Sequence, residues 1–402
     1  MNRDFEVMLT YDFSDNPRHH KKPFDASYFD WMFDEVAEHG PATILYRANL
    51  AGRTYYPSKV FSPFDHSCCF RDEWHKLADV LDRMDPMREC VRAARERSLP
   101  VMIWVNWNEW QCFRQSAVHL VDPVWYANPT KYWASRDRSR FYHGMPVWGD
   151  EEVRARLLAM AMELIAYGSD GIYLSTRSHS WQPGYPVGDS RQYKEGDDFG
   201  FDDVVVEEYR RRHGLNIRYQ DFDVEEWHRI KGEHFTELLR RTGKLCHDAG
   251  QRFIVGTPGD RYSATITNCH MARSCLYYKE WEKWVDQGIV DGIASEMCNS
   301  YESVVEIGDI SEMKKALGKK GKLYPWSIPV YMDRNCIAPP FSLVKWRTKK
   351  PQEIVRQARM AKDAGAAGIV VHEFYWHLFI DTEGEDIGFG PLPQRELWKA
   401  LK

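Results

Sequence analysis

The 402-residue sequence lacks several features that would place it in a large class of proteins. It has no run of about 18 apolar residues, which excludes a membrane-spanning helix. Its nine cysteines include no C-x-x-C pair, which argues against a disulfide framework and against a zinc cluster, and we interpret the adjacent Cys68 and Cys69 as incidental. Neither G-x-G-x-x-G nor G-x-x-x-x-G-K occurs, so the sequence predicts no phosphate-binding loop.

Charge and the N-terminal residues exclude further classes. The 54 basic and 59 acidic side chains give a net charge of −5, and no basic stripe is present, so nucleic acid is not an expected partner. The opening residues, "MNRDFEVMLTYDF", enter a strand-like pattern without the apolar segment of a signal peptide. As given, the sequence predicts a cytoplasmic protein, although a leader already removed would leave no trace. It gives no indication of the oligomeric state.

Aromatic residues are abundant, with 16 Trp, 21 Tyr and 19 Phe. Most of these rings are expected to fill a large core. Many nevertheless stand among hydrogen-bonding residues, as in "NWNEWQCF" and "EFYWH". Aromatic faces flanked by polar groups are typical of sugar-binding clefts, because the ring packs on C–H faces while polar groups bind the hydroxyls. The composition therefore favours a carbohydrate as the partner.

The periodicity of the sequence predicts a parallel α/β protein. Eight short apolar segments are expected to be buried strands. They span residues 5–13, 42–50, 100–110, 170–178, 252–260, 291–297, 322–332 and 366–376. Helices are predicted over 85–99, 150–168, 225–250 and 351–365. A helix, then glycine, then an apolar strand is the repeat of a parallel sheet covered by helices.

Eight such strands favour one closed (β/α)8 TIM barrel over an open sheet, with residues 1–402 forming a single domain. Long loops interrupt the repeat after strands 2, 3 and 4, over residues 51–84, 111–149 and 178–224. All three follow the C-terminal ends of strands, the face that carries active sites in these barrels. Long loops at that face are usually functional.

Polar side chains gather at the same predicted strand ends. The sequence places there Asp12, Tyr46, Arg47, Asn106, Trp107, Glu109, Trp110, Ser175, Arg177, His179, Asp260, Glu296, Tyr331, His372, Glu373, Tyr375 and Trp376. Solvated loops that cap strands would be the alternative explanation. The accumulation of charge at one end of the barrel favours a pocket.

Cleavage of a glycosidic bond needs a carboxylic acid that protonates the leaving oxygen and a second carboxylate as nucleophile or base. Glu296 and Glu373 are the leading pair, because each ends an apolar run where partial burial would raise the pKa of a carboxyl. Their predicted strands are two apart, so their Cα atoms would be about 10 Å apart, which permits either stereochemistry. Asp12 and Asp260 are the next candidates. Each Glu could instead be a rim residue bonded to Arg or Tyr.

Other strand-end residues are candidates for binding the substrate. Arg177 could clamp an acidic substituent or form a structural ion pair, and His179 could bind a hydroxyl or be structural. Hydroxyl-binding or stacking roles are also expected for Arg47, Tyr46, Asn106, Trp107, Glu109, Trp110, Tyr331, Tyr375 and Trp376.

Two other functions remain open. No metal or other cofactor is expected, because H-E-x-x-H, an H-x-H on strand 1 and a carboxylate-rich calcium loop are absent. Nucleophilic serine chemistry is not supported either, because G-x-S-x-G is absent. A metal-dependent hydrolase or deacetylase would nevertheless have Asp12, His179 and His372 available. A sugar-binding barrel without catalysis is the second alternative.

Several motifs resemble the glycosyl-hydrolase-like family 10 barrels. The matching residues lie in a predicted helix, the fourth strand and two further helices. They are Glu152, Val153, Arg154, Tyr167, Asp170, Gly171, Ile172, Glu208, Tyr209, Arg210, Gly214, Trp227 and Arg229. The resemblance covers roughly residues 100 to 300, and more loosely the last strand.

This resemblance implies a (β/α)8 fold and carbohydrate hydrolysis. The family commonly carries an acidic residue three positions after the D-G-I of strand 4, where this chain has Ser175. If that acid is catalytic in relatives, this protein has moved the carboxylate to another strand or lost the activity. Glu296 and Glu373 therefore lead the candidates instead of a residue on strand 4.

Overall fold

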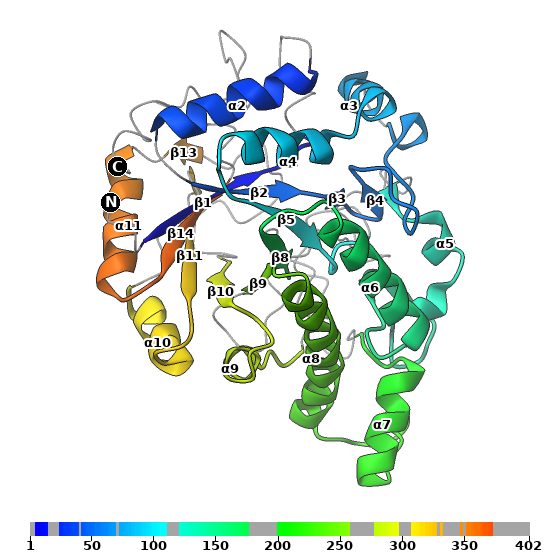
Figure 1. Cartoon of the computed structure of the whole chain (residues 1–402). Coiled ribbons are helices and arrows are strands. Elements are labelled where there is room, and N and C mark those ends of the chain that lie inside the picture. The colour runs from blue at the N-terminus through cyan, green and yellow to red at the C-terminus, as the bar shows by residue number, and fades with distance from the viewer. Residues whose placement is uncertain are drawn as a thin grey trace.

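The centre of the protein is a closed barrel of eight parallel strands (Figure 1). A computed structural model describes residues 5–14, 24–39, 42–69, 72–110, 120–176, 199–257, 277–296, 307–327, 330–332, 346–348 and 351–372. The barrel strands are β1 (Glu6–Tyr11), β2 (Thr43–Arg47), β5 (Val101–Asn106), β8 (Gly171–Ser175), β9 (Arg252–Thr257), β10 (Gly292–Ser295), β11 (Leu323–Ser327) and β14 (Gly368–Val371). Each lies inside a segment predicted from the sequence, and their order around the ring is the order along the chain. The predicted TIM-barrel fold is confirmed.

Helices surround the barrel (Figure 1). They are α2 (Ala26–His39), α3 (Asp72–Arg83), α4 (Pro86–Glu96), α5 (Pro123–Tyr126), α6 (Glu151–Ile165), α7 (Asp203–His213), α8 (Val224–Asp248), α9 (Trp281–Asp286), α10 (Ile307–Leu317) and α11 (Pro351–Asp363). After α6, α8 and α11, Gly168, Gly250 and Gly365 adopt φ values of 70°, 71° and 83°. These positive values explain the helix–glycine–strand pattern, because only glycine reverses the chain there without strain.

No helix in the described part of the chain is long and apolar enough to cross a membrane.

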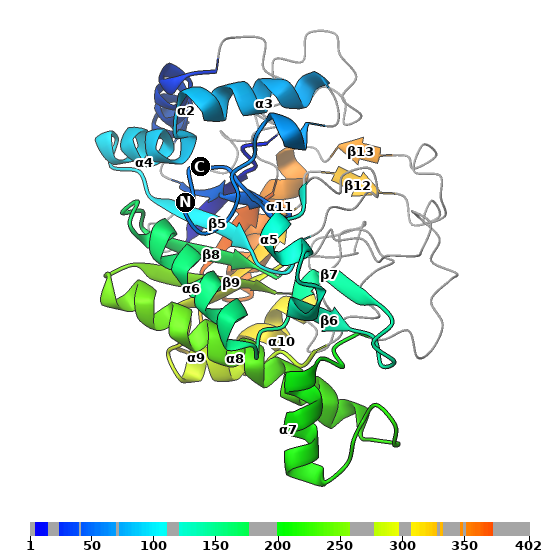
Figure 2. The ribbon, with the colours of Figure 1, turned by 90° about the vertical axis from the view of Figure 1, so that its right-hand side faces the viewer.

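The segments predicted as long loops contain regular structure of their own. The first holds β4 (Arg53–Thr54), which pairs with β3 (Asn49–Leu50) at the end of the predicted second strand, together with the 3-10 turn η1 (His66–Cys68) and α3. The second holds α5, the turn η3 (Pro129–Lys131) and the hairpin β6 (Tyr132–Ala134) and β7 (Phe141–Pro146), and the third holds α7. Figure 2 shows the hairpin β6–β7 on the same side of the barrel as the small sheet β12–β13.

The strand predicted over 322–332 is two separate elements. β11 ends at Ser327, and β12 (Val330–Met332) pairs antiparallel with β13 (Trp346–Thr348), outside the barrel. Tyr331 therefore lies opposite Arg347 in this small sheet and does not end a barrel strand.

An ion pair closes the N-terminal end of the barrel. Glu6 of β1 binds Arg252 of β9 through two contacts of 3.0 Å, and the Thr43 hydroxyl donates to Glu6 at 2.6 Å. Tyr324 of β11 donates to the same carboxylate at 3.2 Å. Burial acts to raise the pKa of Glu6, but the hydrogen bond and charge of Arg252 lower it overall. Because this end is filled by its own polar network, the opposite end is the place for a site.

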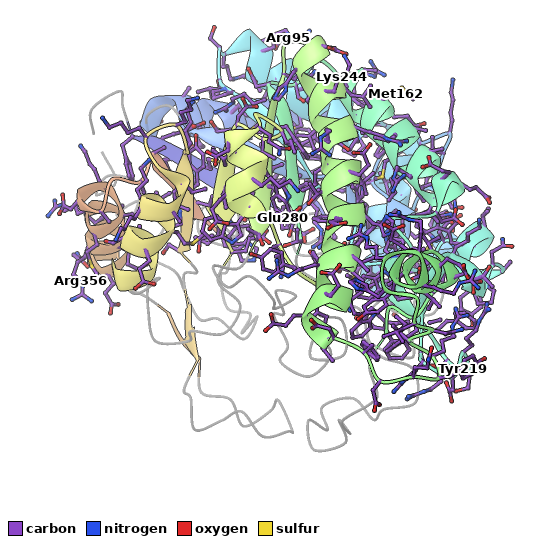
Figure 3. The ribbon with its side chains drawn as sticks, turned by 90° about the horizontal axis from the view of Figure 1, so that it is seen from below. Arg95, Met162, Tyr219, Lys244, Glu280 and Arg356 are labelled. Carbon is purple, nitrogen blue, oxygen red and sulfur yellow. The ribbon has the colours of Figure 1, made fainter. Side chains whose placement is uncertain are left out.

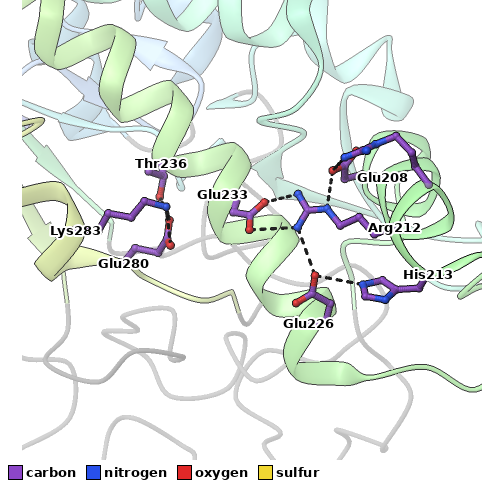
Figure 4. A network of polar contacts seen from close by, with 9 residues as sticks. Glu208, Arg212, His213, Glu226, Glu233, Thr236, Glu280 and Lys283 are labelled. Carbon is purple, nitrogen blue, oxygen red and sulfur yellow. Dashed lines mark hydrogen bonds and ion pairs between the residues drawn. The ribbon is translucent and has the colours of Figure 1, made fainter. Parts of the chain in front are cut away.

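A second ionic network attaches α7 to α8 (Figure 4). Arg212 of α7 binds Glu208 of its own helix at 2.6 Å and Glu233 of α8 at 2.5 Å. Figure 3 shows α8 running across the view, with Lys244 of α8 and Glu280, the residue before α9, labelled. Glu280 accepts from the Thr236 hydroxyl of α8 at 3.1 Å. These contacts hold the insertion after β8 against the helical layer.

Asp202 caps α7 with a carboxyl that is almost completely buried. It accepts from the Val205 N–H at 3.1 Å, and its other oxygen has no hydrogen-bond partner in the described part of the chain. Burial is the main cause that raises the pKa of Asp202 from 3.8 to about 6. Asp202 is therefore still mostly charged at pH 7, and its burial makes that charge cost free energy in the folded protein.

We expect Asp202→Asn to raise the free energy of unfolding at pH 7 by about 1–3 kcal/mol, because a neutral cap removes the buried charge. The penalty in the wild type is full above the folded pKa of about 6 and absent below the unfolded value of 3.8. The difference between variant and wild type should therefore shrink as the pH falls through that window. Urea unfolding at several pH values measures it, and a difference that does not change with pH would contradict the assignment.

Candidate functional site

The C-terminal end of the barrel holds a buried cluster of one arginine and two carboxylates. Arg47, which ends β2, binds Asp12 through Nη1 and contacts both oxygens of Glu109 at 3.1 and 3.3 Å through Nη2. Its Nε donates to the Asn49 carbonyl at 2.8 Å, and its guanidinium lies 5.1 Å from the ring centre of Trp104. Burial alone would lower the pKa of Arg47, but Asp12 and Glu109 raise it overall, so the side chain stays charged.

Asparagines hold this cluster in place. Asn106, the last residue of β5, donates to Glu109 at 3.0 Å, and its backbone N–H donates to the Asn49 side chain at 3.0 Å. Asn108 donates to the Tyr277 hydroxyl and the Thr176 carbonyl, both at 3.3 Å. The Oδ1 atom of Asn108 is buried and has no hydrogen-bond partner within the described ranges. A buried acceptor without a partner costs about 1–3 kcal/mol, a cost that a bound hydroxyl would relieve.

Glu296 directly follows β10 and is buried inside the mouth of the barrel. The Tyr173 hydroxyl of β8 donates to Glu296 Oε1 at 2.9 Å, and the indole N–H of Trp326 donates to that hydroxyl at 2.9 Å. The alternation of side chains along the strands explains why these residues from different strands meet. Trp104, Tyr173 and Ile254 are register partners on adjacent strands, as are Asn106, Ser175 and Gly256 one layer above. Residues of both rows therefore point into the barrel.

The barrel places Glu296 opposite the arginine cluster. β10 and β2 are four strands apart in either direction around the ring of eight. Glu296 therefore faces Arg47 across the mouth, with the aromatic side chains of Trp104, Tyr173 and Trp326 below. Trp326 also packs on the His372 ring, with centroids 4.5 Å apart, and the Thr10 hydroxyl lies 3.0 Å from His372 Nδ1.

Gly256 makes room for the hydrogen bond between Tyr173 and Glu296. A Cβ at residue 256 would lie 2.2 Å from the Tyr173 hydroxyl and 2.4 Å from Glu296 Oε1. We therefore expect Gly256→Ala to displace both side chains and to cost about 1–3 kcal/mol of stability, with a loss of any activity that depends on Glu296. Thermal unfolding and a turnover assay measure the two effects. Gly288→Ala, at a positive φ with open space around it, controls for backbone strain alone. If Gly256→Ala had wild-type activity, Glu296 would not need this position.

Three residues predicted to bind substrate lie in the core. Tyr46 has the opposite strand parity to Arg47, and its ring stacks on Tyr11 with centroids 5.5 Å apart on the helix-facing side of the sheet. Trp110 is buried between Phe61 and Trp125, with centroids 4.6 and 4.7 Å away. Trp107 is buried as well. These contacts argue against a binding role for Tyr46 and Trp110, whereas Trp107 is as buried as Asn106 and Glu109 and its role stays a prediction.

Several candidates cannot be placed. Glu373, Asp260, Arg177, His179, Tyr375 and Trp376 lie outside the described residues. For Tyr331 the structure describes only the backbone position given above. Among the predicted site residues, the structure brings together Asp12, Arg47, Asn106 and Glu109, and it places Glu296 across the mouth from them.

Sequence reasoning missed Tyr173, Trp326, Gly256 and Tyr277. Tyr173 was detectable, because it stands two residues before Ser175 and so shares its strand face. Gly256 and Trp326 likewise lie on the inner face of their strands. Tyr277 had no local signal, because it follows the loop after β9 and reaches Asn108 only through the tertiary fold.

Comparison with known proteins supports the fold. Neither a protein-family model nor a curated protein matches the sequence. The structure is similar to the catalytic domain of a β-amylase from Paenibacillus polymyxa, with a TM-score of 0.54, 12% identity, and coverage of 98% of this chain and 97% of that one. It is also similar to a β-galactosidase from the psychrophilic Marinomonas ef1, with a TM-score of 0.50, 10% identity, and coverage of 91% of this chain and 54% of that one.

At such identities the likeness shows the fold alone. The resemblance to glycosyl-hydrolase-like family 10 stays a prediction. The chain is a (β/α)8 barrel of the kind that carries these two glycosidases.

Proposed function

We propose that this protein is a glycoside hydrolase that cleaves O-glycosidic bonds of an oligo- or polysaccharide at the C-terminal face of the barrel. The observation that carries the proposal is Glu296, a carboxyl buried in the barrel mouth that accepts a hydrogen bond from Tyr173 and faces a fixed arginine–carboxylate cluster. The similar solved structures, a β-amylase and a β-galactosidase, support it at the level of fold.

Glu296 and the cluster of Arg47, Asp12 and Glu109 suit different parts of the reaction. A guanidinium favours the charged form of a neighbouring carboxyl, whereas a general acid must hold a proton before it transfers it. The contact that Glu296 makes with the Tyr173 hydroxyl is with a neutral group. We therefore assign proton transfer to Glu296, with Glu373 as the second carboxylate. Asp12 and Glu109 stay paired with Arg47, where they bind hydroxyls or stabilise positive charge on the sugar.

A screen for hydrolysis tests the proposal directly. The wild type is incubated with a panel of oligo- and polysaccharides, and new reducing ends are measured against a Glu296→Gln/Glu373→Gln double variant. Release of reducing ends by the wild type, lost in the double variant, supports the proposal. Release that is equal in both proteins, or that appears with no member of a broad panel, would overturn it.

A sugar-binding barrel without catalysis is the second candidate. The observation that favours it is Ser175, a buried hydroxyl that stands between Asn106 and Gly256 where the resembling family carries an acid. Calorimetric titration with the same glycans separates the two functions, because binding without cleavage would favour the second one.

The metal-dependent alternative is not favoured by the described contacts. Of its three residues, Asp12 binds Arg47 and His372 contacts Thr10 and Trp326, while His179 lies outside the described residues. Activity that is lost with a chelator and restored by a divalent ion would support it.

A further inference from the structure

A group of metal-binding side chains lies on the surface of the insertion after β2, away from the barrel mouth. His66 is in η1, Cys69 follows it directly, and His75 is in the first turns of α3. One ligand atom from each, two imidazole nitrogens and a sulfur, lie within 4.8 Å of one another. The two Nδ1 atoms are 2.9 Å apart, and the imidazole planes are inclined by only 25°.

The hydrogen bonds of His66 direct the lone pair of its Nδ1 atom at His75, whose Nδ1–H donates to it when no ion is bound. The Nε2 atom of His66 lies 3.3 Å from carboxylate oxygens of both Asp79 and Asp82. These acceptors place the ring proton on Nε2, so the lone pair is on Nδ1, which points at His75. A carboxylate behind a histidine is the usual arrangement around protein-bound metals, because it fixes the tautomer and raises the basicity of the ligand.

The surrounding turn is built to present these side chains. Asp65 caps η1 by accepting from the Ser67 N–H at 2.8 Å, which fixes the turn that carries His66 and Cys69. Phe64, next to Asp65, packs on Trp74, next to His75, with ring centroids 5.5 Å apart. This contact holds η1 against α3, so the ligand atoms are positioned by packing that does not depend on the ion.

We propose that His66 Nδ1, Cys69 Sγ and His75 Nδ1 bind one Zn²⁺ ion, with water in the fourth position. Two imidazoles and a thiolate are ligands that zinc prefers over the oxygen donors required by Mg²⁺ and Ca²⁺. On binding, the thiol of Cys69 loses its proton to solvent and the ring proton of His75 moves from Nδ1 to Nε2, and the nearby charges of Asp79 and Asp82 favour the cation. The interpretation of Cys69 as incidental is replaced by this role.

The site would act as a cross-link within the insertion. It joins η1 to α3 across a short stretch of chain, and a chain of aromatic contacts leads from there to the barrel. Tyr55 lies 6.2 Å from Phe64 and 5.5 Å from Phe13, the residue after Asp12, between ring centroids. Zinc would therefore stabilise the wall of the C-terminal face without entering the site of Glu296.

Titration of the full-length protein with ZnCl2, after removal of metal with a chelator, tests the proposal. We expect one site in the wild type and a loss of affinity of more than about 100-fold in Cys69→Ser and in His75→Ala. The double variant Asp79→Asn/Asp82→Asn, which alters both carboxylates behind His66, should weaken binding by about 10–100-fold. Cys68→Ser, which changes the neighbouring buried thiol, is the matched control and should bind as the wild type does.

Co²⁺ gives a second measurement that does not depend on how well the variants fold. The wild type with one equivalent of Co²⁺ should show a thiolate-to-cobalt charge-transfer band, which Zn²⁺ displaces. Wild-type affinity in Cys69→Ser, no saturable zinc binding in the wild type, or no such band would each overturn the proposal.

Discussion

Glu296→Gln is expected to lower turnover by about 10²–10⁴-fold, the range that general acid–base catalysis contributes. Glutamine has almost the same shape, and its amide oxygen can still accept from the Tyr173 hydroxyl, so the contact that positions the side chain is kept. What is lost is the transferable proton. The measurement is kcat on whichever glycan the wild type cleaves, with thermal unfolding as a check that the fold is intact.

A second Glu→Gln substitution, far from the barrel mouth, tests whether the effect depends on the position of Glu296. Glu312→Gln makes the same substitution on the exposed surface of α10 and should leave kcat unchanged. A KM close to that of the wild type is expected for Glu296→Gln, because the lost interaction belongs to the transition state. Undiminished kcat in this variant would remove Glu296 from the reaction.

The fold could be predicted from the sequence because its signals are local and repeated. Eight apolar runs of strand length recur along the chain, three of them after a predicted helix that ends in glycine, and each barrel strand falls inside one of the eight. Strand ends were harder to predict. The sequence predicts one strand over 322–332, because periodicity does not reveal where an apolar run leaves the sheet, and proline is no signal of that end here, since Pro325 lies within β11.

The site could be predicted only in part, because side-chain direction depends on strand parity. Arg47 and Tyr46 are adjacent in sequence, yet one enters the barrel mouth and the other packs under the helices. Trp110 was expected to stack on sugar but belongs to the core of the insertion, since Phe61 reaches it from a segment about fifty residues earlier. Partners so distant in sequence leave no local pattern.

The residues that carry the family resemblance mostly hold the fold. Asp170 accepts from the Val101 N–H at 2.8 Å, Tyr167 donates to Asp85 at 2.7 Å, and Trp227 donates to the Gly200 carbonyl at 2.9 Å. Each of these contacts joins a helix or loop to its neighbour away from the barrel mouth. Motifs of this kind predict the architecture well, and they leave the chemistry to residues such as Glu296 that lie outside them.

Arg47→Met is expected to lower the free energy of unfolding by about 3–5 kcal/mol, the largest stability effect among our predictions. Arg47 is buried and binds both Asp12 and Glu109, so methionine would fill part of its volume and leave two buried carboxylates without their cation. The cost comes mainly from those charges. Urea unfolding at pH 7 measures it.

Two further measurements show whether Arg47→Met loses stability through unpaired charge or through poorer packing. One varies the pH, and the other neutralises Asp12 and Glu109. Unpaired buried carboxyls favour protonation in the folded state, so the defect of Arg47→Met should shrink as the pH falls from 7 toward 4. Adding Asp12→Asn and Glu109→Gln should recover much of the lost stability, because neutral amides remove the uncompensated charges. A loss below about 1 kcal/mol in the single variant would show that the cluster does not depend on the ion pair. In that case the role of Arg47 would be to bind substrate, and Arg47→Met would change KM instead of the free energy of unfolding.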